Sequence, residues 1–130
     1  MMGYRILYIA KTGDNVMNIS VKLLQENTCV KGFITGEIDA FTAPVLREKL
    51  AEIQLTEDLS IDLNLKDVSY MDSTGLGVFV GFYKSVKASN SHLELTGLSS
   101  RLKRLFDITG LGEIMDIQTA SEEVKIDETV

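Results

Sequence analysis

Residues 60–86 constrain the fold more than any other stretch of this 130-residue chain. In the first part, Ile61, Leu63 and Leu65 alternate with polar residues, which predicts a strand with one buried face. The second part has apolar residues at helical spacing, namely Leu76, Phe79, Val80, Tyr83 and Val86. A strand covered by helices on both faces would be apolar throughout, so we expect a sheet covered mainly on one face.

Patterns elsewhere in the chain predict further strands and helices of a single α/β domain. The expected elements are strands at 18–24 and 28–38 joined by a turn around 25–27, a helix whose stripe is Ala43, Leu46, Leu50 and Ile53, a strand at 92–96, a helix at 99–107 that stops near Gly110, and a last strand at 113–117. Together they predict a mixed β-sheet of about four or five strands, with about three or four helices mainly on one face.

The ends of the chain are expected to lie outside this domain, which spans residues 17–117. We interpret residues 1–16 as a loose N-terminal extension, with an additional edge strand as the alternative. Residues 118–130 are interpreted as a polar acidic tail.

Charge and composition argue against several classes of protein. The formal net charge of −6 disfavours DNA or RNA as a direct partner, and the local cations Arg101, Lys103 and Arg104 are best explained as a solvated helix face. Cys29 has no second cysteine with which to form an internal disulfide, and no signal peptide or apolar run long enough to span a membrane is evident. We therefore expect a cytoplasmic protein without a membrane partner.

The chain has few of the side chains that catalysis or metal binding requires. His92 is the only histidine, and it falls in an expected strand, so a nucleophilic triad and a zinc site are both disfavoured. Glu37, Asp39 and Asp72 offer carboxylates to magnesium, but such clusters at loop ends more often stay unoccupied. We expect no metal and no catalytic residue.

Several glycines are expected to serve packing. Gly75 and Gly77 lack the remaining residues of a dinucleotide loop or a P-loop, so no cofactor is expected. We expect Gly75 to relieve crowding in the first helical turn, and Gly77 with Gly81 to let the helix lie close to a neighbour. Gly32 and Gly36 predict a bulge or a close backbone approach within their strand.

Ser73 stands where the central strand meets the following helix, and its residue type permits two interpretations. A serine at a helix start commonly caps backbone N–H groups, and losing such a cap costs about 1 kcal/mol. The same serine can be presented to an enzyme. Asp72, Ser73 and Thr74 supply more capping groups than one helix start needs, and Met71 is expected to add apolar contact surface. The residues alone leave both interpretations open.

Three separated motifs carry a family resemblance. They are Gly36-Glu37-Ile38-Asp39, Tyr70-Met71-Asp72-Ser73-Thr74-Gly75-Leu76-Gly77 and Leu105-Phe106-Asp107-Ile108-Thr109-Gly110-Leu111. In order and spacing the chain resembles bacterial anti-sigma-factor antagonists with a STAS domain, most of all those of the general stress sigma-factor pathway. The similarity covers about Met17 to Ile117.

The resemblance implies a regulatory switch that is not an enzyme. In that family the unphosphorylated antagonist binds an anti-sigma factor that is also a serine kinase, and so frees the sigma factor. The kinase phosphorylates the serine that matches Ser73, with Thr74 as the alternative site in this chain, and a PP2C-type phosphatase restores binding. The expected partner-binding residues are Asp39, Thr42, Met71, Asp72, Ser73, Thr74 and Leu76.

Two other functions remain as alternatives at this point. A STAS scaffold module would assemble with other STAS domains into a larger stress-signalling complex, without a kinase partner. An enzyme or nucleotide-binding protein would use Gly75, Gly77 and the nearby acids, and it predicts that the isolated chain binds GTP or ATP.

Overall fold

A computed structural model describes residues 5–11 and 19–119 of the chain. Its elements are β1 (Arg5–Lys11), β2 (Ile19–Glu26), β3 (Cys29–Ile38), α1 (Ala43–Leu50), β4 (Ser60–Met71), α2 (Ser73–Ala88), β5 (His92–Leu98), α3 (Ser100–Ile108), the 3₁₀ turn η1 (Leu111–Glu113) and β6 (Asp116–Thr119). The described strands form one sheet of six in the order β1-β2-β3-β4-β5-β6. β1 to β3 pair antiparallel and β3 to β6 pair parallel, which confirms the expected mixed sheet.

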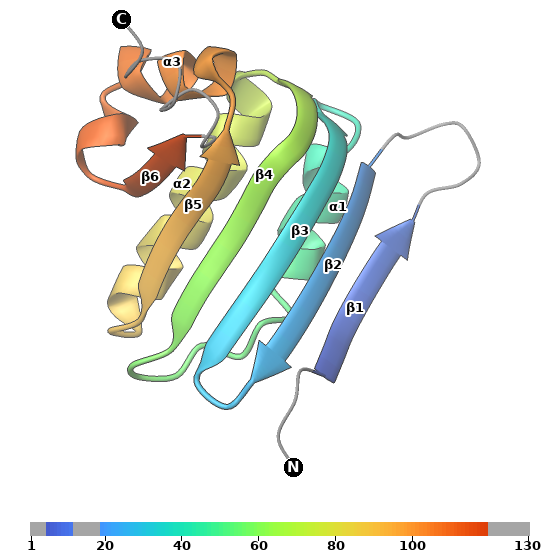
Figure 1. The fold of residues 1–130 in the computed structure, drawn as a ribbon, viewed down its shortest axis with the longest axis vertical. Coiled ribbons are helices and arrows are strands. Elements are labelled where there is room, and N and C mark those ends of the chain that lie inside the picture. Colours follow the sequence, from blue (N-terminus) through green and yellow to red (C-terminus); the bar gives the residue numbers. More distant parts are fainter. Residues whose placement is uncertain (1–4, 12–18, 120–130) are drawn as a thin grey trace, which may run out of the picture.

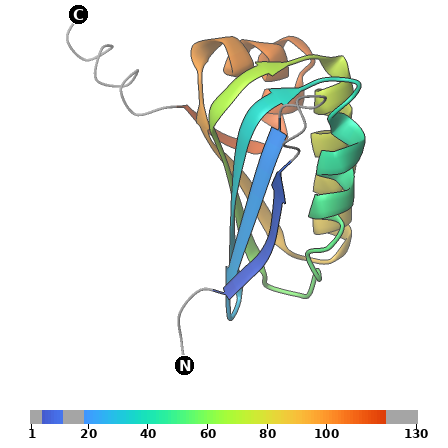
Figure 2. The ribbon, with the colours of Figure 1, turned by 90° about the vertical axis from the view of Figure 1, so that its right-hand side faces the viewer.

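The helices cover the sheet mainly on one face, as expected. α1 and α2 lie side by side against this face, and α3 lies at the end of the sheet where β3 and β4 finish (Figures 1 and 2). The core fills the space between the sheet and these helices, with Leu23, Ile34, Leu63, Leu95 and Phe79 all 1% exposed or less. Burial of these side chains is the main stabilising term for a layered fold of this kind.

The expected first hairpin is present, but its turn lies at residues 27–28 instead of 25–27. Glu26 pairs with Cys29, so a two-residue turn of Asn27 and Thr28 joins β2 to β3. Asn27 has a φ of 52°, a left-handed conformation that asparagine tolerates better than most residues.

β1 corrects the interpretation of the N-terminal region. Arg5 pairs with Gln25 and Lys11 with Ser20, so residues 5–11 form an antiparallel edge strand on β2. The interpretation of these residues as a loose extension is therefore wrong, and the alternative interpretation as an edge strand is confirmed. Only pairing with a distant segment stabilises an edge strand, and local pattern does not reveal that pairing. Residues 1–4 and 12–18, like residues 120–130 of the expected tail, lie outside the described residues.

β4 continues to Met71, beyond the alternating residues Ile61, Leu63 and Leu65 from which the strand was predicted. After Leu65 the spacing of its buried residues changes. Its later buried residues are Val68 and Met71, which are spaced by three instead of two. The register against β3 shifts at two places, between Phe33 and Thr35 and again after Gly36. Each shift adds a residue to β4, as in a β-bulge, and the bulges break the alternation without ending the strand.

The glycine predictions divide into confirmed and wrong ones. Gly36 has a φ of 111° beside a register shift, so the bulge predicted there is confirmed. A Cβ on Gly32 would lie 2.6 Å from Leu63 Cδ2, so the close approach at Gly32 is to a side chain and not to backbone. The close packing expected at Gly77 and Gly81 is wrong, because a Cβ on either would meet no atom within 4 Å. Both glycines instead line an open groove of about 420 Å³ between α1 and α2.

The remaining elements differ from expectation mainly in detail. On α2 the buried residues include Val78 and Phe82, whereas Val80 and Tyr83 are only half-buried. The last strand begins at Asp116 rather than at residue 113, because Leu111–Glu113 form a 3₁₀ turn. Tyr83 donates a hydrogen bond from its hydroxyl to the Ile114 carbonyl oxygen at 3.0 Å, which ties this turn to α2.

Candidate functional site

Two loops meet where β3 and β4 end. Because these strands are parallel and Ile38 pairs with Met71, the residues that follow both strands leave the sheet at the same edge. The backbone N–H of Asp72 donates to the Ile38 carbonyl oxygen at 3.3 Å, which fixes one loop against the other. Asp39 thus lies in the loop beside Asp72 and Ser73, as the resemblance implies.

Asp72 is the N-cap of α2. It has an extended backbone, and its Oδ1 accepts hydrogen bonds from the N–H groups of Thr74, at 3.0 Å, and Gly75, at 3.4 Å. These N–H groups belong to the first helical turn and have no partner within the helix, so the carboxylate satisfies them and also complements the positive end of the helix dipole.

Ser73 is the first residue of α2 and is exposed. Among the described residues its hydroxyl makes no hydrogen bond, and its neighbour Thr74 is also exposed. The interpretation of Ser73 as the helix cap is therefore wrong, since Asp72 performs that task. The local fold does not use the Ser73 hydroxyl, which is open to solvent at a helix N-terminus.

The loop between β3 and α1 is held by its own side chains. Asp39 Oδ1 accepts from the N–H groups of Phe41, at 2.9 Å, and Thr42, at 3.0 Å. Thr42 Oγ1 accepts from the Asp39 N–H at 2.9 Å and donates to the Glu37 carbonyl oxygen at 2.8 Å. This mutual capping gives the loop a defined conformation immediately before α1.

The expected partner-binding residues fall into two groups by burial. Asp39, Asp72, Ser73 and Thr74 have exposed or half-buried side chains around the junction. Thr42, Met71 and Leu76 are 2%, 7% and 5% exposed, so they pack beneath the junction. The expectation that Met71 adds apolar contact surface is therefore wrong, because its side chain is buried. The loop also contains a residue that the motifs did not single out, Phe41, which is 75% exposed. Its only sequence signal is an aromatic residue in the short loop between Asp39 and Thr42.

Gly75 lets α2 begin close to the ends of β3 and β4. A Cβ at this position would lie 2.6 Å from Ile38 Cγ2 and 2.7 Å from Met71 Cγ, both shorter than real Cβ contacts allow. The expectation that Gly75 relieves crowding in the first turn is confirmed, and the crowding comes from the neighbouring strands.

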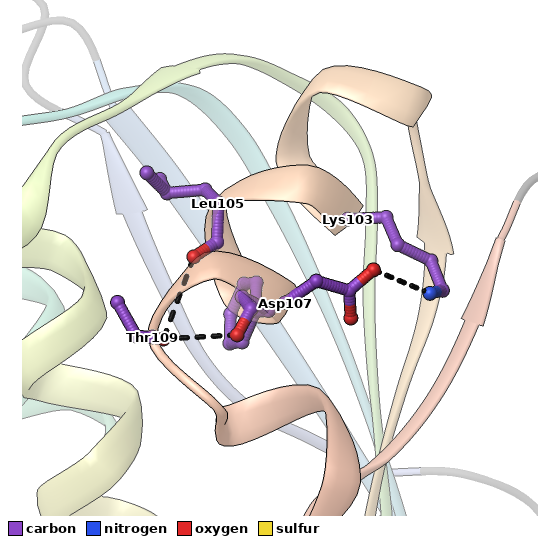
Figure 3. Close-up of polar contacts among 5 residues, drawn as sticks. Lys103, Leu105, Asp107 and Thr109 are labelled. Atoms are coloured by element: carbon purple, nitrogen blue, oxygen red, sulfur yellow. Dashed lines mark hydrogen bonds and ion pairs between the residues drawn. The ribbon is translucent and has the colours of Figure 1, made fainter.

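The third motif ends α3 and is held by local contacts (Figure 3). Thr109 Oγ1 donates to the Phe106 carbonyl oxygen at 2.9 Å, and Lys103 Nζ pairs with Asp107 Oδ2 at 2.8 Å. Gly110 then adopts a φ of 84°, the left-handed conformation that commonly ends a helix. Phe106 is fully buried, with its ring centroid 6.2 Å from that of Phe79 on α2, so this residue of the motif belongs to the core.

Other chemistry is sparse in the described part of the chain. His92 pairs with Asp116 across β5 and β6 at 3.2 Å, and it lies opposite Ser60 at the start of β4, at the other end of that strand from Ser73. Within residues 5–11 and 19–119, no three His, Cys, Asp or Glu side chains gather in a way that could hold a metal ion. None of the described helices combines the length and apolar character needed to cross a bilayer.

Comparisons with known proteins identify the family and relatives of the chain. A model of the STAS domain family matches residues 20–125. The chain is 54% identical over 106 residues to the anti-sigma-B factor antagonist of Bacillus subtilis, covering 82% of this chain and 96% of that protein. It is 49% identical over 109 residues to the anti-sigma-B factor antagonist of Listeria monocytogenes, covering 83% and 96%.

A solved structure shares the fold at low sequence identity. The crystal structure of an anti-sigma factor antagonist from Mycobacterium paratuberculosis superposes with a TM-score of 0.70 at 17% identity, covering 91% of this chain and 97% of that one. This likeness shows a common arrangement of strands and helices.

Proposed function

The chain belongs to the STAS domain family, and from this premise we propose that it is an anti-sigma factor antagonist switched by phosphorylation of Ser73. In the unphosphorylated form it binds an anti-sigma factor with serine kinase activity and so frees a sigma factor. The kinase modifies Ser73 and ends the binding, and a PP2C-type phosphatase restores it. The chain is the substrate of both enzymes and acts in the cytoplasm, where its partners control transcription.

The observation that carries the proposal is the division of tasks at the start of α2. Asp72 caps the helix, so the exposed hydroxyl of Ser73 can enter a kinase cleft without loss of a structural hydrogen bond. The two curated relatives support the partner, since both are named as antagonists of an anti-sigma-B factor.

Electrostatics explains how a phosphate would end the binding. A phosphoserine carries about −1.5 to −2 charges at neutral pH. It would appear at Ser73 beside the carboxylate of Asp72, on the surface formed by Asp39, Asp72, Ser73 and Thr74. Burying such a charge without a partner costs roughly several kcal/mol, and about 1.4 kcal/mol already weakens binding tenfold. Release therefore needs no refolding of the chain.

The test uses the purified anti-sigma-B factor of Bacillus subtilis as the probe, because the relative from that organism is 54% identical. With ATP present, wild type should gain one phosphate at Ser73, and Ser73→Ala should gain none yet bind as tightly as wild type. Ser73→Asp should bind at least tenfold more weakly. Site mapping by mass spectrometry and isothermal titration give the two readouts.

Thr74→Ala is the matched control, since Thr74 is also exposed and is one residue away. It should be phosphorylated like wild type. Phosphate on Thr74 in the Ser73→Ala chain would contradict the assigned site. A wild-type chain that fails to bind the probe and instead assembles only with other STAS domains would favour the scaffold alternative.

A further inference from the structure

We propose that Phe41 is an apolar anchor of the partner interface, received by an apolar pocket of the anti-sigma factor. The inference rests on the proposed function and adds to it a contact residue outside the family motifs. Phe41 is 75% exposed, the largest exposed fraction among the large hydrophobic side chains in the described region. A single exposed apolar residue is ordinary on a protein surface, so exposure alone does not carry the inference.

The second observation is that the loop holds Phe41 in one backbone conformation. Its N–H donates to Asp39 Oδ1 at 2.9 Å, and the next residue, Thr42, is 2% exposed and bonded to both Asp39 and Glu37. An aromatic side chain on a preorganised loop loses little conformational entropy on binding, as is typical of the residues that dominate interface affinity.

The third observation is proximity to Ser73. Phe41 lies three residues after Ile38, and Ser73 lies two residues after Met71, the partner of Ile38 in the sheet. Five residues of extended chain and one spacing between neighbouring strands are the most that can separate the two Cα atoms, so these atoms lie within about 23 Å of each other. A standard interface of about 800 Å² on each side is about 30 Å across, which is wide enough for one partner surface to contact both residues.

These contacts also assign a role to Asp39. Its Oδ1 accepts from the N–H groups of Phe41 and Thr42, so through this oxygen the carboxylate positions Phe41 for the partner. Asparagine keeps an oxygen that accepts the same hydrogen bonds but removes the charge, whereas alanine removes the acceptor. The pair Asp39→Asn and Asp39→Ala therefore separates positioning from direct ionic contact.

The experiment measures the dissociation constant of the full chain and the purified Bacillus subtilis anti-sigma-B factor by isothermal titration. Phe41→Ala should weaken binding at least tenfold. Phe33→Ala is the matched control, because Phe33 is 40% exposed but lies on the sheet face away from the helices, and it should change binding by less than twofold. Asp39→Ala should weaken binding as Phe41→Ala does, and Asp39→Asn should stay within about threefold of wild type.

Thermal unfolding of each variant, followed by circular dichroism, shows whether weaker binding comes from an unfolded chain or from the loss of the contact. If wild type binds the probe and a folded Phe41→Ala binds equally well, the inference is overturned while the proposed function stands. If wild type does not bind the probe at all, the proposed function fails, and the anchor fails with it. Loss of binding in Asp39→Asn equal to that in Asp39→Ala would overturn the positioning role.

Discussion

At the scale of single residues, different side chains at the start of α2 serve as the helix cap and as the proposed phosphorylation site. Oδ1 of Asp72 accepts two backbone hydrogen bonds and leaves the hydroxyl of Ser73 exposed. Aspartate, serine and threonine are all good N-caps, so three such residues in succession do not reveal which one caps the helix. The backbone geometry after β4 decides it, because Asp72 is the residue with extended φ and ψ immediately before the helix.

Gly75 and Gly77 give a matched prediction on the same helix. Gly75→Ala should lower the free energy of unfolding by about 1–3 kcal/mol, because its Cβ would lie 2.6 Å from Ile38 Cγ2. Gly77→Ala should leave it unchanged or raise it by up to about 1 kcal/mol, because alanine favours helix and no atom lies within 4 Å of the added Cβ. Urea denaturation monitored by circular dichroism measures both. Equal effects of the two substitutions would contradict the close approach at Gly75.

The glycines also show what a sequence cannot convey at this scale. Gly75, Gly77 and Gly81 look alike as small residues on a helix, and only the position of α1 and of the strand ends tells the crowded one from the open ones. The exposure of Phe41 cannot be predicted from the sequence for a similar reason, since it depends on how the Asp39 loop directs the chain.

At the scale of elements, the hairpin, α1, α2, α3 and β5 could be predicted because each has a strong local pattern. Ala43, Leu46 and Leu50 are all buried on α1, as their helical spacing indicates. The end of β4, the edge strand β1 and the start of β6 could not. Bulges broke the alternation in β4, and β1 depends on a partner nine or more residues away in the sequence.

The capping role of Asp72 at the start of α2 leads to a prediction at this scale. Asp72→Ala should lower the free energy of unfolding by about 1 kcal/mol, because it leaves the N–H groups of Thr74 and Gly75 without their acceptor. Asp72→Asn should retain most of the stability, since asparagine is also a good N-cap. Chemical denaturation of the three chains tests this, and an unchanged stability of Asp72→Ala would mean that the carboxylate does not cap the helix.

At the scale of the whole molecule, the fold places the surface that we propose is phosphorylated where a charge can be added without disturbing the core. The edge where β3 and β4 end carries Asp39, Asp72 and Ser73, whereas the side chains beneath it, such as Ile38 and Met71, are buried. A helix N-terminus favours an anion by about 0.3–1 kcal/mol, which offsets repulsion from Asp72. Phosphorylation should therefore change the partner's affinity and leave the domain folded.

The measurement that tests this account most directly compares the chain phosphorylated at Ser73 with the unphosphorylated chain, each titrated into the anti-sigma-B factor of Bacillus subtilis. The account predicts a dissociation constant at least tenfold weaker for the phosphorylated chain, while its free energy of unfolding stays within about 1 kcal/mol of the unmodified chain. Equal dissociation constants for the two forms would contradict the switch at Ser73.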